Sequence, residues 1–199
     1  MKATQTPSLI GITLLKVMSK LPLKLQYSLG KGLGIFLFYI MKKRRNIVEI
    51  NLSLCLKELA IAERRQLCKQ IFIENGIGVF ETGFAWWGNA KKIKNLVKFE
   101  GTQHVEAAIN KSKGVILLGA HYSTLDLGGL LVSMRYPIHA MYRPHNNHLL
   151  EQYIRKGRLK SLSSLIDRSD FRAVIKALKQ NEIVWYAPDQ DFGPDNSVF

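Results

Sequence analysis

The sequence GVILLGAHYSTLD, which runs from Gly114 to Asp126, decides the fold class. Its first half is a short apolar run bounded by glycines, which is typical of a strand buried on both faces. Its second half is polar and leads into a helix-like stretch that begins at Leu125. A buried strand that passes directly into a helix is the repeating unit of proteins with a parallel sheet.

The alternation of predicted strands and helices continues on both sides of this stretch. The pattern predicts strands over 97–101, 138–142 and 183–186, and helices over 103–110, 125–135, 149–159 and 171–179. Upstream, residues 46–87 predict two helices, with a break or bend near Gly76 and Gly78. The alternation predicts an α/β fold with a mostly parallel central sheet and flanking helices. Because a turn-rich loop closes the sequence beside an open sheet edge, we expect a chain that is truncated at its C-terminus.

Two apolar runs precede this region, Leu9–Val17 and Leu33–Met41, and lysines interrupt the sequence between them. Neither run reaches the roughly 20 apolar residues that a membrane-spanning helix requires. The pattern favours a helix in the membrane interface or a short anchor, and the basic cluster Lys42–Arg45 favours anionic lipid. The alternative is a buried core helix with a solvated charged end. We expect residues 1–45 to be a membrane-associating helical segment and residues 46–199 to be the α/β domain.

The composition is basic, with 29 Lys and Arg against 15 Asp and Glu and a formal net charge of +14. Such a surface attracts nucleic acid, anionic lipid or acidic carrier proteins. Neither an aromatic and basic platform nor a recognition helix is evident, so nucleic acid is not an expected partner. Cys55 and Cys68 lack the further ligands of a zinc site and predict reduced thiols. We expect no cofactor and no metal.

His121 is the candidate catalytic residue, since the strand delivers it to the edge where parallel sheets bind ligands. Asp126 falls in the first turn of the next helix if Ser123 or Thr124 is the N-cap. Asp126 is then expected to hold one imidazole nitrogen, which leaves the other to accept a proton. No Ser or Cys nucleophile is arranged with this pair, so direct attack by a substrate hydroxyl is the simpler chemistry. The alternative is a histidine that is merely satisfied within the turn.

Further candidates lie after the later strands. Arg143 follows the strand 138–142, and Arg168 and Arg172 flank the start of a helix, where an anion is favoured. Each arginine could instead be an ordinary surface or ion-pair residue. Asp189 ends the last strand and is expected to position Arg143 or the substrate, or to shape the turn.

Several blocks together resemble a known family. The segment GAHYSTLD, from Gly119 to Asp126, resembles the H-x4-D/E motif of the glycerolipid and lipid A acyltransferases. Four more blocks resemble the late acyltransferases of lipid A biosynthesis, most closely the lauroyltransferase branch: KKRRNIVEINLSLC, ENGIGVFETGFAWW, RYPIHAMYRPHNN, and LIDRSDFR through IKALKQNEIVWYAPDQDFGPDNSVF. The resemblance runs over nearly the whole chain.

The resemblance implies a specific function, which the spacing of the residues alone does not indicate. The donor would be an acyl chain on acyl carrier protein, and the acceptor a hydroxyl of a Kdo-bearing lipid A precursor. The enzyme would work at the cytoplasmic face of the inner membrane, with His121 and Asp126 as its catalytic dyad. Family members also continue well beyond the DQDFG segment, so the resemblance implies that part of the sheet and of the pocket is missing from this sequence. The open alternatives are a glycerophospholipid or other glycolipid acceptor, and a non-enzymatic basic module that binds membranes.

Overall fold

The computed structural model describes residues 6–189. Its α-helices and strands follow in the order α1 (Thr6–Met18), α2 (Leu23–Ile40), α3 (Lys42–Cys55), α4 (Ile61–Trp87), α5 (Thr102–Ile109), β1 (Val115–Leu118), α6 (Leu125–Ser133), β2 (Ile138–Tyr142), α7 (His148–Arg158), β3 (Ser164–Asp167), α8 (Phe171–Lys179) and β4 (Ile183–Tyr186). Two short 3₁₀ turns, η2 (Ala90–Lys92) and η3 (Lys94–Leu96), connect α4 to α5.

The strands form a parallel sheet in the order β1-β4-β2-β3, which confirms the predicted α/β class. Strand β4 therefore lies between β1 and β2, although it comes last along the described chain. On one face Val115, Ile138 and Ile183 form a buried cluster that also receives side chains of α5 and α6. On the other face Ile166 and Val184 pack against α8. The sheet thus has helices on both faces, which is why its strands read as continuous apolar runs.

Two sequence-based expectations about strands were wrong. Residues 97–101 form no strand but an irregular connection, because no neighbouring strand among the described residues offers their backbone a ladder. Strand β3 was not predicted, since only Leu165 and Ile166 in it are buried and the run is too short to show a period.

Helix α4 runs without interruption through Gly76 and Gly78, so the expected break is also wrong. The two glycines instead allow close packing. Gly76 lies against the backbone of Gly30 and Gly34 on α2, where an added Cβ would stand 2.5 Å from the backbone nitrogen of Gly34. A missing side chain at a helix contact lets two backbones approach without breaking the hydrogen bonds of either helix.

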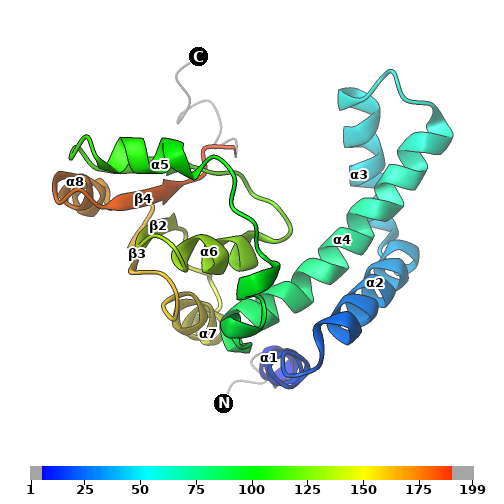
Figure 1. Cartoon of the computed structure of the whole chain (residues 1–199). Helices are drawn as coiled ribbons and strands as arrows, with labels where there is room; N and C mark the ends of the chain where they lie inside the picture. Colours follow the sequence, from blue (N-terminus) through cyan, green and yellow to red (C-terminus); the bar gives the residue numbers. More distant parts are fainter. Residues whose placement is uncertain (1–5, 190–199) are drawn as a thin grey trace.

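Helices α2, α3 and the first half of α4 form a helical arm that projects away from the sheet, while the end of α4 reaches α6 and α7 (Figure 1). Phe38, Leu52, Cys68 and Phe72 form the core of this arm. Burial raises the pKa of the Cys68 thiol, and Cys55 is exposed. None of the described helices is long and apolar enough to cross a membrane.

Gly34→Ala is expected to destabilise the protein by about 3 kcal/mol, since overpacking against unyielding groups costs this much. The new Cβ would lie 2.5 Å from Ile73 Cα on α4, and backbone atoms cannot move aside as a flexible side chain can. Gly32→Ala is the matched control on the same helix, because no atom of the described residues lies within 4 Å of the position its new methyl group would take. That control should be neutral or gain up to about 1 kcal/mol from helix propensity. Equal urea midpoints for the two variants would contradict the proposed close contact.

Candidate active site

The candidate site is built at the carboxyl ends of two adjacent strands. His121 lies three residues beyond the end of β1, and Asp189 lies three residues beyond the end of β4. The parallel register pairs Leu118 with Tyr186, so the two loops leave the sheet side by side. The backbone N–H of Gly119 donates to the carbonyl of Tyr186 at 2.9 Å and continues the ladder into the loops.

Asp189 holds His121 at two points. The imidazole Nδ1 lies 2.8 Å from Oδ1 of Asp189, and the backbone N–H of His121 donates to Oδ2 at 2.7 Å. The His121 side chain is 40% exposed and that of Asp189 is 34% exposed. An ionised carboxylate only accepts hydrogen bonds, so Nδ1 carries a proton, and in the neutral form of the imidazole Nε2 is then the nitrogen with the free lone pair. The arrangement is therefore suited to a general base.

The two hydrogen bonds also set the charge of the carboxylate. The backbone N–H of His121, and after it the imidazole, lower the pKa of Asp189 below its ordinary value. The contact therefore stabilises the folded loops above the ordinary aspartate pKa, and this stabilisation is lost as the pH falls through the lowered pKa. At neutral and mildly acidic pH the pair stays intact.

Trp185 supports the loop from within the sheet. Its ring meets the imidazole of His121 edge to face, with 6.3 Å between the ring centroids. Gly119 lies directly on the indole, and any added Cβ would overlap its nitrogen. At the other side of the loop, the backbone of Gly78 on α4 meets the carbonyl of Ser123. The loop that carries His121 is thus wedged between β4 and α4.

Asp126 does not occupy the expected place beside His121. It lies in the first turn of α6 and points toward α7 and the end of α4. Its Oδ1 accepts from Arg158 Nε at 2.7 Å and from Trp86 Nε1 at 3.0 Å, while Oδ2 accepts from Arg158 Nη2 at 3.2 Å. In the described residues, the carboxylate that contacts the imidazole is that of Asp189. Thr124 is the N-cap of α6, as one of the two expected residues, but its side chain makes no capping hydrogen bond.

Arg158 was missed by the sequence reasoning. It is the last residue of α7, and its side chain is 24% exposed against 11% for Asp126. The preceding residue, Gly157, lies flat against the indole of Trp86. The sequence did offer one signal, a glycine followed by an arginine at the end of an amphipathic helix. A glycine there lets a bulky side chain pack against the helix, and the arginine can then extend beyond that side chain to a partner on another element.

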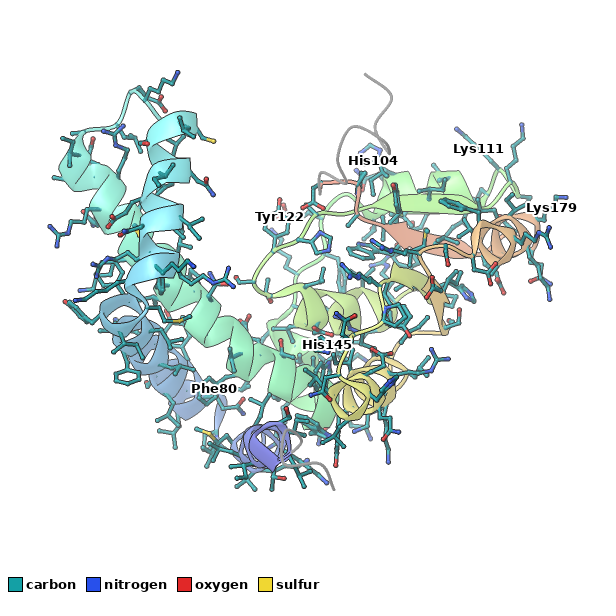
Figure 2. All side chains as sticks on the ribbon, turned by 180° about the vertical axis from the view of Figure 1, so that it is seen from behind. Phe80, His104, Lys111, Tyr122, His145 and Lys179 are labelled. Atoms are coloured by element: carbon teal, nitrogen blue, oxygen red, sulfur yellow. The ribbon has the colours of Figure 1, made fainter. Side chains whose placement is uncertain are left out.

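A cavity of about 340 Å³ opens beside these residues. Ala120 and Tyr122, the two neighbours of His121 in the chain, line it, whereas His121 and Asp189 themselves are not among the described residues of its wall. Asp126, Arg158 and Trp86 also line it. Apolar side chains and glycines form most of the remaining wall: Leu117, Leu118, Gly119, Leu125, Gly128, Gly129, Leu130, Val132, Ile138, Ala140, Met141, Leu162 and Trp185. Figure 2 shows Tyr122 on the loop that faces the helical arm. A mostly apolar cavity with a few convergent polar groups is typical of a ligand site.

The three arginines lie at the same edge of the sheet. Arg143 directly follows β2 and is exposed, and Arg168 directly follows β3 and donates its backbone N–H to the carbonyl of Tyr142 at 2.9 Å. Arg172 is exposed in the first turn of α8, whose N-cap Asp170 accepts from Ala173 N at 3.0 Å. Within the described part of the chain, Asp189 pairs with His121 and forms no ion pair with Arg143. Among the described residues, no group of three or more His, Cys, Asp or Glu could hold a metal ion.

These features define an α/β protein whose apolar cavity opens beside a carboxylate-paired histidine at the carboxyl ends of parallel strands. The chain belongs to the bacterial lipid A biosynthesis acyltransferase family, whose model matches residues 2–199. This confirms the resemblance noted in the sequence.

Proteins with similar sequences are also lipid A biosynthesis acyltransferases. The chain is 40% identical over 190 residues to the lipid A biosynthesis lauroyltransferase of Escherichia coli K12, covering 96% of this chain and 62% of that protein. It is 34% identical to the lipid A biosynthesis palmitoleoyltransferase of the same organism, over 95% of this chain and 62% of that protein. A lipid A biosynthesis acyltransferase of Haemophilus influenzae is 35% identical, over 96% of this chain and 61% of that protein. The chain thus spans about three fifths of the length of these relatives.

Proposed function

We propose that this protein transfers a fatty acyl chain from acyl carrier protein to a hydroxyl of a Kdo-bearing lipid A precursor. The observation that carries the proposal is the His121–Asp189 pair beside an apolar cavity, in a chain of the lipid A acyltransferase family. The carboxylate fixes the imidazole so that Nε2 is the proton acceptor. The cavity offers an apolar wall for a hydrocarbon chain.

In the proposed reaction, Nε2 of His121 takes the proton of the acceptor hydroxyl. At the same time the hydroxyl oxygen attacks the carbonyl carbon of the donor thioester. The resulting oxyanion is stabilised by backbone N–H groups at the start of α6, which the Thr124 side chain does not cap. The intermediate then collapses, the carbon–sulfur bond breaks, and the imidazolium gives its proton to the carrier thiolate. The products are the acylated acceptor and the free carrier thiol, and the base is regenerated.

Asp126 retains a proposed role in this scheme through Arg158. The pair forms one side of the cavity, so it fixes the first turn of α6 relative to α7. The α6 N–H groups proposed to meet the oxyanion belong to that same turn. Asp126 would therefore act by positioning helix α6, without touching the imidazole or the reacting atoms.

The arginines are proposed to bind the anionic substrates. Arg143, Arg168 and Arg172 lie at the edge of the sheet that carries His121, and no carboxylate partner is evident for Arg143 among the described residues. The phosphates and sugar acids of the acceptor and the acidic surface of the carrier protein are suitable ligands. The net charge of +14 attracts both.

We further propose that the protein docks on the cytoplasmic face of the inner membrane through its N-terminal helices. These helices expose large apolar side chains, among them Ile10, Leu14, Val17, Phe36, Tyr39, Ile40, Ile50 and Leu54. The basic sequence Lys42–Arg45 forms the first turn of α3 beside this surface. Exposed apolar side chains next to cations are typical of a helix that lies in the interface of an anionic membrane.

The test is mass spectrometry of lipid A from a strain that lacks the enzyme and is complemented with the complete gene. Restoration of a lipid A species heavier by one acyl chain supports the proposal, and the mass difference gives the chain length. Restoration of a phospholipid instead of lipid A would assign the acceptor to the glycerophospholipids. Unchanged lipids would refute the transfer reaction.

Asp189→Asn is expected to lower kcat by about 10²-fold or more, because the amide no longer selects the tautomer with a free Nε2. Glu182→Gln is the matched control, since Glu182 pairs with another histidine, His139, at 3.2 Å near the opposite ends of the strands. The control should retain its transfer rate within about twofold. Equal losses in the two variants would show that a generic histidine–carboxylate contact, and not the site, is responsible.

A further inference from the structure

Lysines surround the C-terminal end of α4, behind the wall of the cavity. Lys160, just beyond α7, donates from Nζ to the carbonyl of Trp86 at 2.6 Å. Lys20, just beyond α1, donates to the carbonyl of Trp87, the next residue. Two ammonium groups from distant parts of the chain thus meet at adjacent carbonyls of one helix end.

Two further lysines complete the group. Lys16 lies in the last turn of α1, and Lys156 lies in the last turn of α7. The pKa of Lys160 is lowered, first by burial and then by the like charges of Lys20, Lys156 and Lys16. We call these four residues the lysine cluster. Their ammonium groups repel one another, and a bound anion would relieve the repulsion.

Helix capping explains only half of the cluster. Cations favour the C-terminal end of a helix, and this accounts for Lys20 and Lys160. It does not account for Lys16 and Lys156, whose side chains make no hydrogen bond or ion pair with the described residues. Two positive charges therefore remain available to a ligand at a place where the chain has already gathered two others.

The surroundings of the cluster indicate what kind of anion it meets. Helix α1, which carries Lys16, exposes Ile10, Leu14 and Val17, and each of these side chains is more than half exposed. Their spacing places them along one face of the helix. Cations beside an exposed apolar helix face fit a lipid, whose phosphate lies directly above its hydrocarbon, better than they fit a nucleic acid.

We propose that the lysine cluster is a binding site for the phosphate of an anionic membrane lipid. The site rests on the membrane docking proposed above and is independent of the transfer reaction. Between Lys156 and Lys160 lie Gly157 and Arg158, which line the cavity. A lipid phosphate held by the cluster therefore fixes the cavity against the membrane surface from which the acceptor comes.

The test is cosedimentation of the full-length protein with vesicles of phosphatidylcholine containing phosphatidylglycerol, at low salt. The variant Lys16→Gln/Lys156→Gln is expected to bind about tenfold more weakly, since each lysine near an anionic surface contributes several-fold. Because these two side chains have no partner among the described residues and only repel the other lysines, the melting temperature of the variant should not fall. The difference from the wild type should vanish at high salt, where exposed charges are screened.

The matched control is Lys111→Gln/Lys179→Gln, which removes the same net charge at the end of the molecule far from α1 (Figure 2). It should bind within about twofold of the wild type. Equal weakening in both variants would overturn the proposal in favour of a general effect of net charge. Failure of the wild type to bind any vesicle would overturn the docking surface and the site together.

A second measurement separates the two sources of lipid phosphate. The KM for the acceptor in neutral detergent micelles should be the same for the wild type and Lys16→Gln/Lys156→Gln. A raised KM with unchanged vesicle binding would assign the cluster to the acceptor and overturn its assignment to the membrane. Loss of vesicle binding with normal transfer in micelles would support the site as proposed.

Discussion

Replacing His121 with alanine is expected to lower the rate of acyl transfer by about 10³-fold, within the range that general-base catalysis contributes. The variant removes the nitrogen that would accept the proton of the attacking hydroxyl. Its fold should persist, because the imidazole is 40% exposed and its partners in the described chain are the Asp189 carboxylate and the ring of Trp185. A single-turnover assay with saturating donor measures the chemical step directly.

Two further variants make this result specific. His121→Asn retains a side-chain N–H that can donate to Asp189 but offers no base, so it should lose as much activity as the alanine variant. His104→Ala removes another exposed histidine, on α5, and should leave the rate unchanged. A loss of less than tenfold in His121→Ala would show that the imidazole is not the base.

Replacing Arg158 with alanine is expected to destabilise the fold by about 3 kcal/mol, because it leaves a largely buried carboxylate without its cation. The Asp126 side chain is only 11% exposed, and Trp86 would be its remaining partner in the described structure. Arg158→Lys should recover less than half of the loss, since an ammonium cannot repeat the two hydrogen bonds that the guanidinium donates. Urea unfolding measures both effects.

A double-mutant cycle decides what Asp126 does. If Asp126 acts through Arg158, the double variant Asp126→Ala/Arg158→Ala should be about as stable as either single variant, with a coupling free energy of about 1 to 3 kcal/mol. Their rates of transfer should also fall together. Additive losses of stability, with activity lost only when Asp126 is replaced, would return Asp126 to a direct role on the imidazole.

The elements that could be predicted from sequence are those with a strong local pattern. Strands β2 and β4 and helix α8 were predicted at their observed bounds, because each combines apolar periodicity with clear flanking residues. Strand β3 was missed because its four residues show little strand pattern of their own, and its extended form depends on pairing with β2. The expected break at Gly76 failed because propensity cannot reveal that another helix packs there.

The same distinction applies to the site. His121 could be placed at the end of a strand from local sequence, and Asp189 could be nominated from its position after another strand. Their pairing could not be predicted, since it depends on β4 lying next to β1, which is a matter of sheet order. The pairing of Arg158 with Asp126 could not be predicted either, because the two residues lie 32 positions apart on two different helices.

The position of β4 has a consequence for how this protein matures on the ribosome. β1, β2 and β3 are synthesised before β4, yet β4 occupies the interior of the sheet between β1 and β2. In the described sheet β1 and β2 are therefore joined only through β4, and their connection cannot form before β4 has been synthesised. Asp189 follows β4, so the contact between the His121 imidazole and this carboxylate forms only after residues 183–189 have been synthesised.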